Sequence, residues 1–237
     1  MAGHSKWANI RHRKGKADAL KGKIISRSAK EIITAVKLGG SDPKNNPRLR
    51  LALEKAKAGN VPNEVIDRNI KKGMSQDTSS YENVTYELYG YGGVGIIVDI
   101  LTDNRNRISS DIRIATNKRG GTVATPGAVA FNFDRKGVIE LPKAAGNEDD
   151  LFALAIDSGA EDFESQEDGF FITTDPQELD QVVTALKDKN ITITEASLTM
   201  IPKTTIACSE EDSKSNLALI EWIEALDDVD ELYHNME

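Results

Sequence analysis

The chain has 237 residues, of which 39% are hydrophobic and 29% charged, as in an ordinary globular protein. Its single cysteine, Cys208, excludes an internal disulfide framework and a cysteine-built zinc site. Three histidines are too few to favour a histidine-rich metal centre. No run of about 18 apolar residues predicts a membrane span, and the charged start does not resemble a secretory signal. We therefore expect a cytoplasmic protein without a metal or cofactor.

The net charge of −8 conceals an uneven distribution along the chain. Residues 1–74 hold 18 of the 30 Lys and Arg but 6 of the 38 Asp and Glu, which gives +12. The remaining 163 residues hold 12 basic and 32 acidic side chains, which gives −20. This asymmetry is typical of a chain that binds nucleic acid at one end, and a solvated, lysine-rich helical surface is the alternative.

Residues 1–74 are expected to form a basic helical domain. Apolar residues recur at helical spacing over residues 18–38 and predict a first amphipathic helix. Asn46-Pro47 predicts the N-cap and first turn of a second helix. Pro62 opens a third helix, which should end before Gly73. Three helices with short loops make a small bundle.

Strands and helices alternate after a polar linker, which is expected over residues 74–82. From 134 to 202 their order is βαββαβ, the ferredoxin-like arrangement. The last elements of the chain lack partners nearby in sequence and would complete a sheet that begins near residue 83. We therefore predict a multidomain α+β fold, in which a helical domain precedes two ferredoxin-like domains, one inserted in the other. The predicted domains are 1–74, 80–133 plus 203–237, and 134–202.

Local patterns predict further details of the two α+β domains. Alternation of apolar residues over 129–133 indicates a strand, and another strand is expected to begin at Ile191. A short strand should follow Pro202. A helix should begin near Asp103, with Thr102 or Asp103 as its N-cap.

The segment from Gly90 to Gly95 matches the pattern G-x-G-x-x-G. A dinucleotide-binding loop needs a helix after its glycines, but the apolar run at 96–98 predicts a strand. We therefore expect a hairpin turn with positive φ angles, not a nucleotide site.

No catalytic constellation is evident in the sequence. Cys208 has no histidine near it in the chain, and such a cysteine is usually a small core residue. The carboxylates of the acidic segments are expected on solvated helix faces, without paired motifs for acid–base work. No catalytic residue is therefore assigned, and the protein is not expected to be an enzyme.

The segment 3–16 is the leading candidate for a binding site, because it holds five Lys or Arg, two His and Trp7 but no carboxylate. Long cations neutralise phosphates, Trp7 can stack on a base, and Asn9 can hydrogen-bond base edges or phosphates. The alternatives are a solvated surface with Trp7 anchored in the helical core, or a mitochondrial transit peptide. The candidate nucleic-acid-binding residues are His4, Lys6, Trp7, Asn9, Arg11, His12, Arg13, Lys14 and Lys16.

Arg105 and Arg107 form a secondary candidate site for an anion. They are rare cations in an acidic region, and they lie at the start of a predicted helix, where the amide dipole favours negative charge. Ordinary capping of this helix by its neighbours is the structural alternative.

Several long motifs resemble those of the YebC/PmpR family. They are GHSKWANIRHRKGKAD, NPRLRLALEKAKAGNVPNEVIDRNIKKG, YELYGYGGVGIIVDILTDNRNR and NKRGG, and the resemblance covers essentially the whole chain. This family includes bacterial proteins described as probable transcriptional regulators and the mitochondrial translational activator of cytochrome c oxidase subunit I. The resemblance implies a helical N-terminal domain with two α+β domains. Because the family motif begins at Gly3, it also argues against a transit peptide.

The resemblance implies one of two roles: DNA-binding control of transcription, or action on the ribosome through rRNA during synthesis of difficult sequences such as proline runs. The nucleic-acid contacts would map to His4, Lys6, Trp7, Asn9, Arg13 and Lys14. We expect a DNA-binding transcriptional regulator with no membrane partner. A ribosome-associated translation factor is the first alternative, because the charge lies on an arm and no helix-turn-helix pair is obvious. The second is a protein-interaction module whose acidic α+β domains bind a protein partner.

Overall fold

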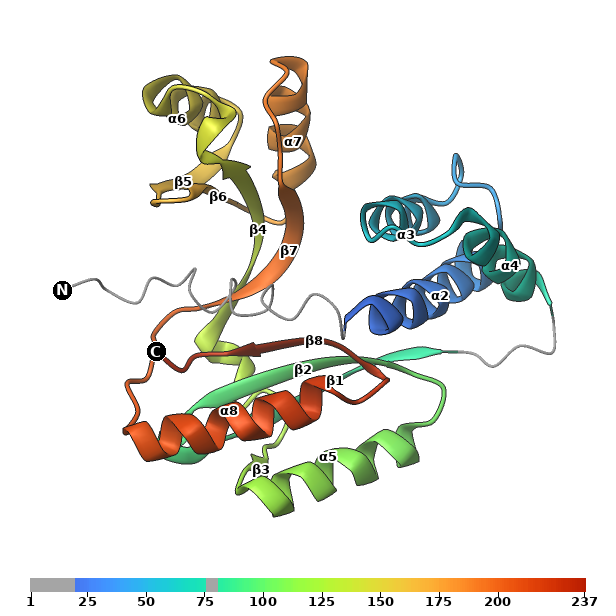
Figure 1. Cartoon of the computed structure of the whole chain (residues 1–237), viewed down its shortest axis with the longest axis vertical. Coiled ribbons are helices and arrows are strands. Elements are labelled where there is room, and N and C mark those ends of the chain that lie inside the picture. The colour runs from blue at the N-terminus through green and yellow to red at the C-terminus, as the bar shows by residue number, and fades with distance from the viewer. Residues whose placement is uncertain (1–19, 76–80) are drawn as a thin grey trace. The chain divides into compact units, whose positions relative to one another are not determined.

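A computed structural model describes residues 20–75 and 81–237. These residues form seven α-helices and two four-stranded antiparallel sheets (Figure 1). The predicted α+β class and the N-terminal helical region are confirmed. The chain divides into two compact units, one of residues 1–131 with 204–237 and the other of residues 132–203.

Three helices form the N-terminal part of the first unit: α2 (Leu20–Gly39), α3 (Pro47–Ala58) and α4 (Asn63–Met74). Helices α3 and α4 both pack on α2 and share with it a core of Ile32, Val36, Leu49, Ala52, Ala56, Val61 and Ile66. Gly73 lies inside α4, not past its end as predicted. A Cβ at this position would meet Val36 of α2 at 2.8 Å, so the glycine permits close approach of the two helices.

The side chain of Asn46 joins the end of α2 to the start of α3. Its Oδ1 accepts the backbone N–H of Leu49 at 3.0 Å, which confirms the predicted N-cap. Its Nδ2 donates to the carbonyl oxygens of Ala35 and Gly40, each at 2.8 Å. One buried amide therefore satisfies backbone groups at both helix ends.

The first sheet has the strand order β3-β1-β2-β8 and belongs to the first unit. Its strands are β1 (Glu82–Tyr89), β2 (Gly95–Thr102), β3 (Thr122–Val123) and β8 (Val229–His234). The helices α5 (Arg105–Arg119) and α8 (Glu210–Glu224) share one apolar core with it. Because β8 pairs with β2, the end of the chain completes this sheet as predicted.

The turn between β1 and β2 contains the G-x-G-x-x-G segment. A short 3-10 turn spans Tyr91–Gly93, with φ of +67° at Gly92 and +80° at Gly93. Asn216 of α8 accepts the N–H of Tyr91 at 2.8 Å and donates to its carbonyl oxygen at 3.1 Å. The predicted hairpin is confirmed, and a strand follows the glycines where a dinucleotide-binding loop would need a helix.

The second unit has the element order βαββαβ and the sheet order β5-β6-β4-β7. In the first sheet, β3, β2 and β8 take the positions that β5, β4 and β7 hold in the second. The remaining position, which β6 holds in the second sheet, is taken by β1, and β1 precedes β2 in the chain. The two ferredoxin-like arrangements therefore differ in chain order. The elements of the second unit are β4 (Phe133–Pro142), α6 (Glu148–Asp157), β5 (Ala160–Ser165), β6 (Gly169–Thr174), α7 (Leu179–Asp188) and β7 (Glu195–Pro202).

Two strand predictions were wrong in their starting points. Residues Ala130–Asn132 form a 3-10 turn, and the strand begins at Phe133. Strand β7 begins at Glu195, not at Ile191, because Ile191 packs against the core of the second unit after the left-handed Asn190, whose φ is +60°.

Two further local predictions were also wrong. The segment after Pro202 forms an isolated bridge between Ile206 and Met236 and not a strand. The N-cap of α5 is Asn104, whose Oδ1 accepts the N–H of Arg107 at 3.0 Å. Thr102 does not cap the helix, because its hydroxyl accepts the N–H of Asn104 at 3.0 Å, and Asn104 precedes the first residue of α5.

Glu87 is a buried carboxylate, 8% exposed, that holds the loop after β3. It accepts the backbone N–H groups of Gly127 at 2.6 Å, Val129 at 2.5 Å and Ala130 at 2.8 Å. Burial by itself would raise the pKa of Glu87, but these three hydrogen bonds outweigh it, and the net pKa is lowered. The same contacts explain why residues 129–132 turn instead of forming a strand.

We expect Glu87→Gln to lower the free energy of unfolding by about 1.5–3 kcal/mol, because a neutral amide cannot replace the charge-assisted bonds. The folded-state pKa is lowered, so the stabilisation is complete above the ordinary glutamate pKa and is lost as the pH falls through the folded value. Thermal unfolding of both proteins across acidic and neutral pH measures this difference.

Glu82→Gln is the matched control, because this glutamate is exposed on the same strand. It should change the unfolding temperature little. An equal loss of stability in both variants, or a loss at Glu87 that ignores pH, would contradict the assigned role of the carboxylate.

Candidate nucleic-acid interface

The main candidate residues, His4, Lys6, Trp7, Asn9, Arg11, His12, Arg13, Lys14 and Lys16, lie outside the residues that the structure describes. The described part of the basic residues 1–74 begins at α2. Residues 20–75 hold 13 Lys and Arg against 5 Asp and Glu, a net charge of +8. The three helices therefore carry much of the basic charge by themselves.

Six cations of this helical region are exposed and make no ion pair with a carboxylate in the described part of the chain. The apolar sides of α3 and α4 face α2, so charged side chains on the other sides project into solvent. Exposed cations of this kind can each neutralise a phosphate. They are Lys44 before α3, Arg50, Lys55 and Lys57 on α3, and Arg68 and Lys71 on α4.

Other cations of α2 and α3 are paired with carboxylates. Arg48 binds Glu31 of α2 through two nitrogens, at 2.9 and 3.2 Å. Lys30 of α2 places its Nζ 2.6 Å from Oδ1 of Asp228 and 2.8 Å from the carbonyl oxygen of Asp227. These side chains differ from the six above because they already have an anionic partner.

Arg27, one turn before Lys30 on α2, also has acidic partners. Its Nη2 lies 2.5 Å from Oε1 of Glu231, and its Nε contacts the carboxylate of Asp230. Both partners belong to β8, more than 200 positions along the chain. Together with Lys30, this arginine joins α2 to the turn between α8 and β8 and to the start of β8.

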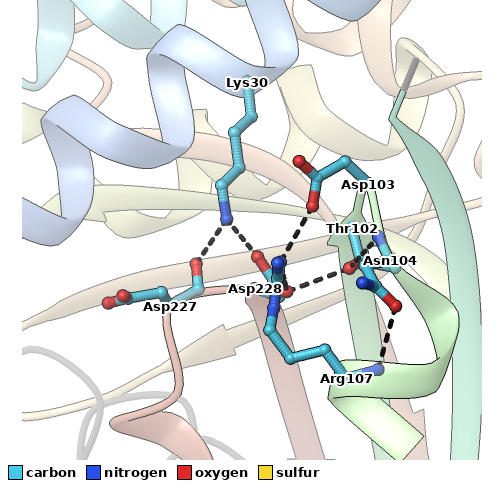
Figure 2. Close-up of polar contacts among 7 residues, drawn as sticks. All are labelled: Lys30, Thr102, Asp103, Asn104, Arg107, Asp227 and Asp228. Carbon is cyan, nitrogen blue, oxygen red and sulfur yellow. Dashed lines mark hydrogen bonds and ion pairs between the residues drawn. The ribbon is translucent and has the colours of Figure 1, made fainter. Parts of the chain in front are cut away.

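The secondary candidate site, Arg105 and Arg107, lies in the first turn of α5. Arg107 Nη2 is 2.6 Å from Oδ2 of Asp228 and 2.9 Å from Oδ1 of Asp103 (Figure 2). Arg105 Nε is 3.3 Å from Oε2 of Glu82. Both guanidinium groups already lie beside carboxylates, so an external anion here would have to displace them.

Asp228 is the centre of this polar cluster and is 7% exposed. Its carboxylate accepts from Lys30 at 2.6 Å, Arg107 at 2.6 Å and the Thr102 hydroxyl at 2.9 Å (Figure 2). Burial would raise the pKa of Asp228, but these hydrogen bonds outweigh it and lower the net pKa. Asp228 is therefore a stable, buried anion at neutral pH.

A cleft of about 550 Å³ lies beside Asp228. Its charged lining consists of four aspartates and two cations, so it does not suit a phosphate group. These residues are Asp103, Asp111, Asp227, Asp228, Lys30 and Arg107.

Cys208 packs partly buried against the core of the first unit. Burial raises the pKa of its thiol, and the charge of Asp212 adds to the increase. A protonated thiol is a poor nucleophile. Within residues 20–75 and 81–237, no three His, Cys, Asp or Glu side chains are grouped so that they could hold a metal ion. No helix of that part is both long and apolar enough to span a bilayer.

Sequence reasoning missed the pairing of Arg27 and Lys30 with the acidic segment near the C-terminus. Lys30 and Asp228 are 198 positions apart, so no local spacing rule connects them. The available signal was the opposite net charge of residues 1–74 and of the rest of the chain. Opposite charges predict that the two regions attract each other, but they do not identify which side chains pair.

Comparisons with known proteins cover almost all of the chain. The family model described as the TACO1/YebC protein N-terminal domain matches residues 5–76, and the model described as the TACO1/YebC second and third domain matches residues 81–236. A conserved hypothetical protein of Aquifex aeolicus has a similar crystal structure, with a TM-score of 0.85 and 42% identity, covering 98% of this chain and 97% of that one.

Two bacterial relatives are similar over the full length of this chain. A probable transcriptional regulatory protein of Protochlamydia amoebophila is 66% identical over 237 residues, which are 100% of this chain and 97% of the relative. A probable transcriptional regulatory protein of Chlamydia muridarum is 54% identical over 237 residues, which are 100% of both chains. Their names support a regulator at the level of the family. On these matches and its α+β fold, the chain belongs to the TACO1/YebC family.

Proposed function

We propose that this protein is a non-enzymatic, cytoplasmic regulator of gene expression that binds nucleic acid through residues 1–74, as a DNA-binding transcriptional regulator. The division of charge carries the proposal: +12 in residues 1–74 and −20 in the rest. Phosphate backbones repel the acidic remainder, so the favourable electrostatic energy must come from the basic part. The names of the relatives support the regulator class.

The exposed cations of α3 and α4 add a second line of support. Arg50, Lys57 and Arg68 are examples that project into solvent without a described carboxylate partner. Together with the five cations that the sequence has in the segment 3–16, they raise the number of cations available to phosphates. Several such cations suit several phosphates along a strand, and such contacts position a protein without reading bases.

A ribosome-associated translation factor that binds rRNA is the second candidate. Beyond the segment 3–16, the cations are spread over α2, α3 and α4, so none of these described helices concentrates them as a reading helix would. Distributed phosphate contacts favour recognition by shape, which is typical of RNA. In either case, the acidic α+β domains are free to bind a protein partner.

Replacing Lys6, Arg13 and Lys14 with Ala in the full chain should weaken binding to DNA and RNA of any sequence. Each phosphate contact that is lost should flatten the slope of log affinity against log salt by roughly 0.7–0.9. A second set, Arg50, Lys57 and Arg68 to Ala, tests the helical surface in the same way. Fluorescence titration at several salt concentrations measures both slopes.

The matched control replaces Lys136, Lys143 and Lys187, three cations of the second unit, with Ala. The charge change is the same, but the slope should stay that of the wild type. Equal slopes in all three sets would contradict the assignment of binding to residues 1–74. Sedimentation with ribosomes, with and without RNase, beside promoter DNA binding then separates the two candidate functions.

Cys208→Ser should leave the regulatory activity intact, because the thiol has a raised pKa and packs against the core. Reporter expression in cells that carry the variant measures the activity, and thermal unfolding checks that the variant is folded. Loss of activity in a folded variant would overturn the non-enzymatic assignment.

A further inference from the structure

We infer that the acidic segment 227–231 competes with nucleic acid for the cations of α2, and that bound nucleic acid displaces it. The inference rests on the proposed function. Arg27 and Lys30 belong to the basic residues 1–74, yet carboxylates of this segment already hold them. In the free protein the segment acts as an internal substitute for phosphates.

The contacts are those that a nucleic-acid backbone would make. Lys30 donates to Asp228 at 2.6 Å and to the carbonyl oxygen of Asp227 at 2.8 Å (Figure 2). Arg27 binds Asp230 and Glu231 with different nitrogens of its guanidinium group. Residues three apart on a helix lie on one face, so a single face of α2 meets a row of negative groups. A phosphate backbone offers the same chemistry.

The acidic side is fixed independently of α2. Arg107 of α5 and Thr102 at the end of β2 hold Asp228, at 2.6 and 2.9 Å. Asp228 consequently keeps two of its partners when Lys30 leaves. Two carboxylates face Arg27, which is roughly one-third exposed together with them, so this pair is accessible to salt and to a competing polyanion.

The contact between α2 and the acidic segment is polar. The helices α2, α3 and α4 share one apolar core, and the first sheet with α5 and α8 has another. No buried apolar cluster among the described residues includes members of both groups. Ionic contacts can be exchanged for phosphate contacts without opening either core, so displacement does not require unfolding.

Competition of this kind lowers the apparent affinity for every nucleic acid by the fraction of molecules with the contact open. Because this factor is the same for every ligand that needs these cations, the ratio of affinities between two such targets does not change. The acidic segment would instead raise the concentration that every target needs for binding, so a weak, non-specific target stays unbound where a strong one still binds.

A pair of spin labels tests the displacement directly. In a Cys208→Ser background, Ser26→Cys on α2 and Ala225→Cys beside the acidic segment place labels on two sides of one cleft without changing charge. The distance between the labels should lengthen when a mixed-sequence DNA duplex or an RNA hairpin is added. Labels at Asn117→Cys on α5 and Leu217→Cys on α8 are the control, because these helices share one core, and their distance should not change.

A charge variant provides the second measurement. Asp230→Asn with Glu231→Gln should bind both probes more tightly than wild type, and its salt slope should steepen by roughly 0.7–0.9 for the released Arg27. Glu167→Gln with Glu211→Gln removes the same charge from exposed side chains outside the acidic segment and is the control. An equal gain in both variants would overturn the inference, because net charge alone would then explain it.

The outcomes separate this inference from the proposed function. If neither wild type nor the Asp230→Asn, Glu231→Gln variant binds either probe at low salt, the proposed function fails and the competition fails with it. If wild type binds a probe but the distance between the labels at 26 and 225 does not change, only the inference of displacement is overturned.

Discussion

A buried charge must be compensated, and Asp228 shows how this chain meets that requirement. Its carboxylate lies at the junction of α2, β2, α5 and the turn before β8, and each of the first three contributes a donor. The helical part, the first sheet and the end of the chain therefore meet at one anion. The position of α2 beside this part of the first unit depends on ionic contacts and not on a shared apolar core.

Elsewhere, single polar side chains connect elements by satisfying backbone groups. Asn46 closes the ends of two helices, Asn216 holds the glycine turn, and Glu87 binds three amides of one loop. Each of these side chains forms hydrogen bonds with backbone groups that lack a partner within their own loop or helix end.

Periodicity in the sequence predicted the helices, the glycine hairpin and the ferredoxin-like order, because these depend on neighbours along the chain. It failed at the start of α5, where three consecutive polar residues, Thr102, Asp103 and Asn104, could cap the helix and the choice depends on side-chain geometry. It also missed the partners of Arg27 and Lys30, which depend on distant residues. The charge of residues 1–74 was readable from composition, but which of its cations pair with carboxylates was not.

The second unit interrupts the first, and this has a consequence for synthesis of the protein. Lys203 donates its N–H to the carbonyl oxygen of Asn132 at 2.8 Å, so the two ends of the insertion are joined within the second unit. All strands of the second sheet leave the ribosome before α8 and β8, whereas the first sheet cannot be completed until β8 has emerged. The inserted unit can therefore fold before the first sheet is complete, and Asp228, whose carboxylate binds Lys30 of α2, is translated after the whole inserted unit.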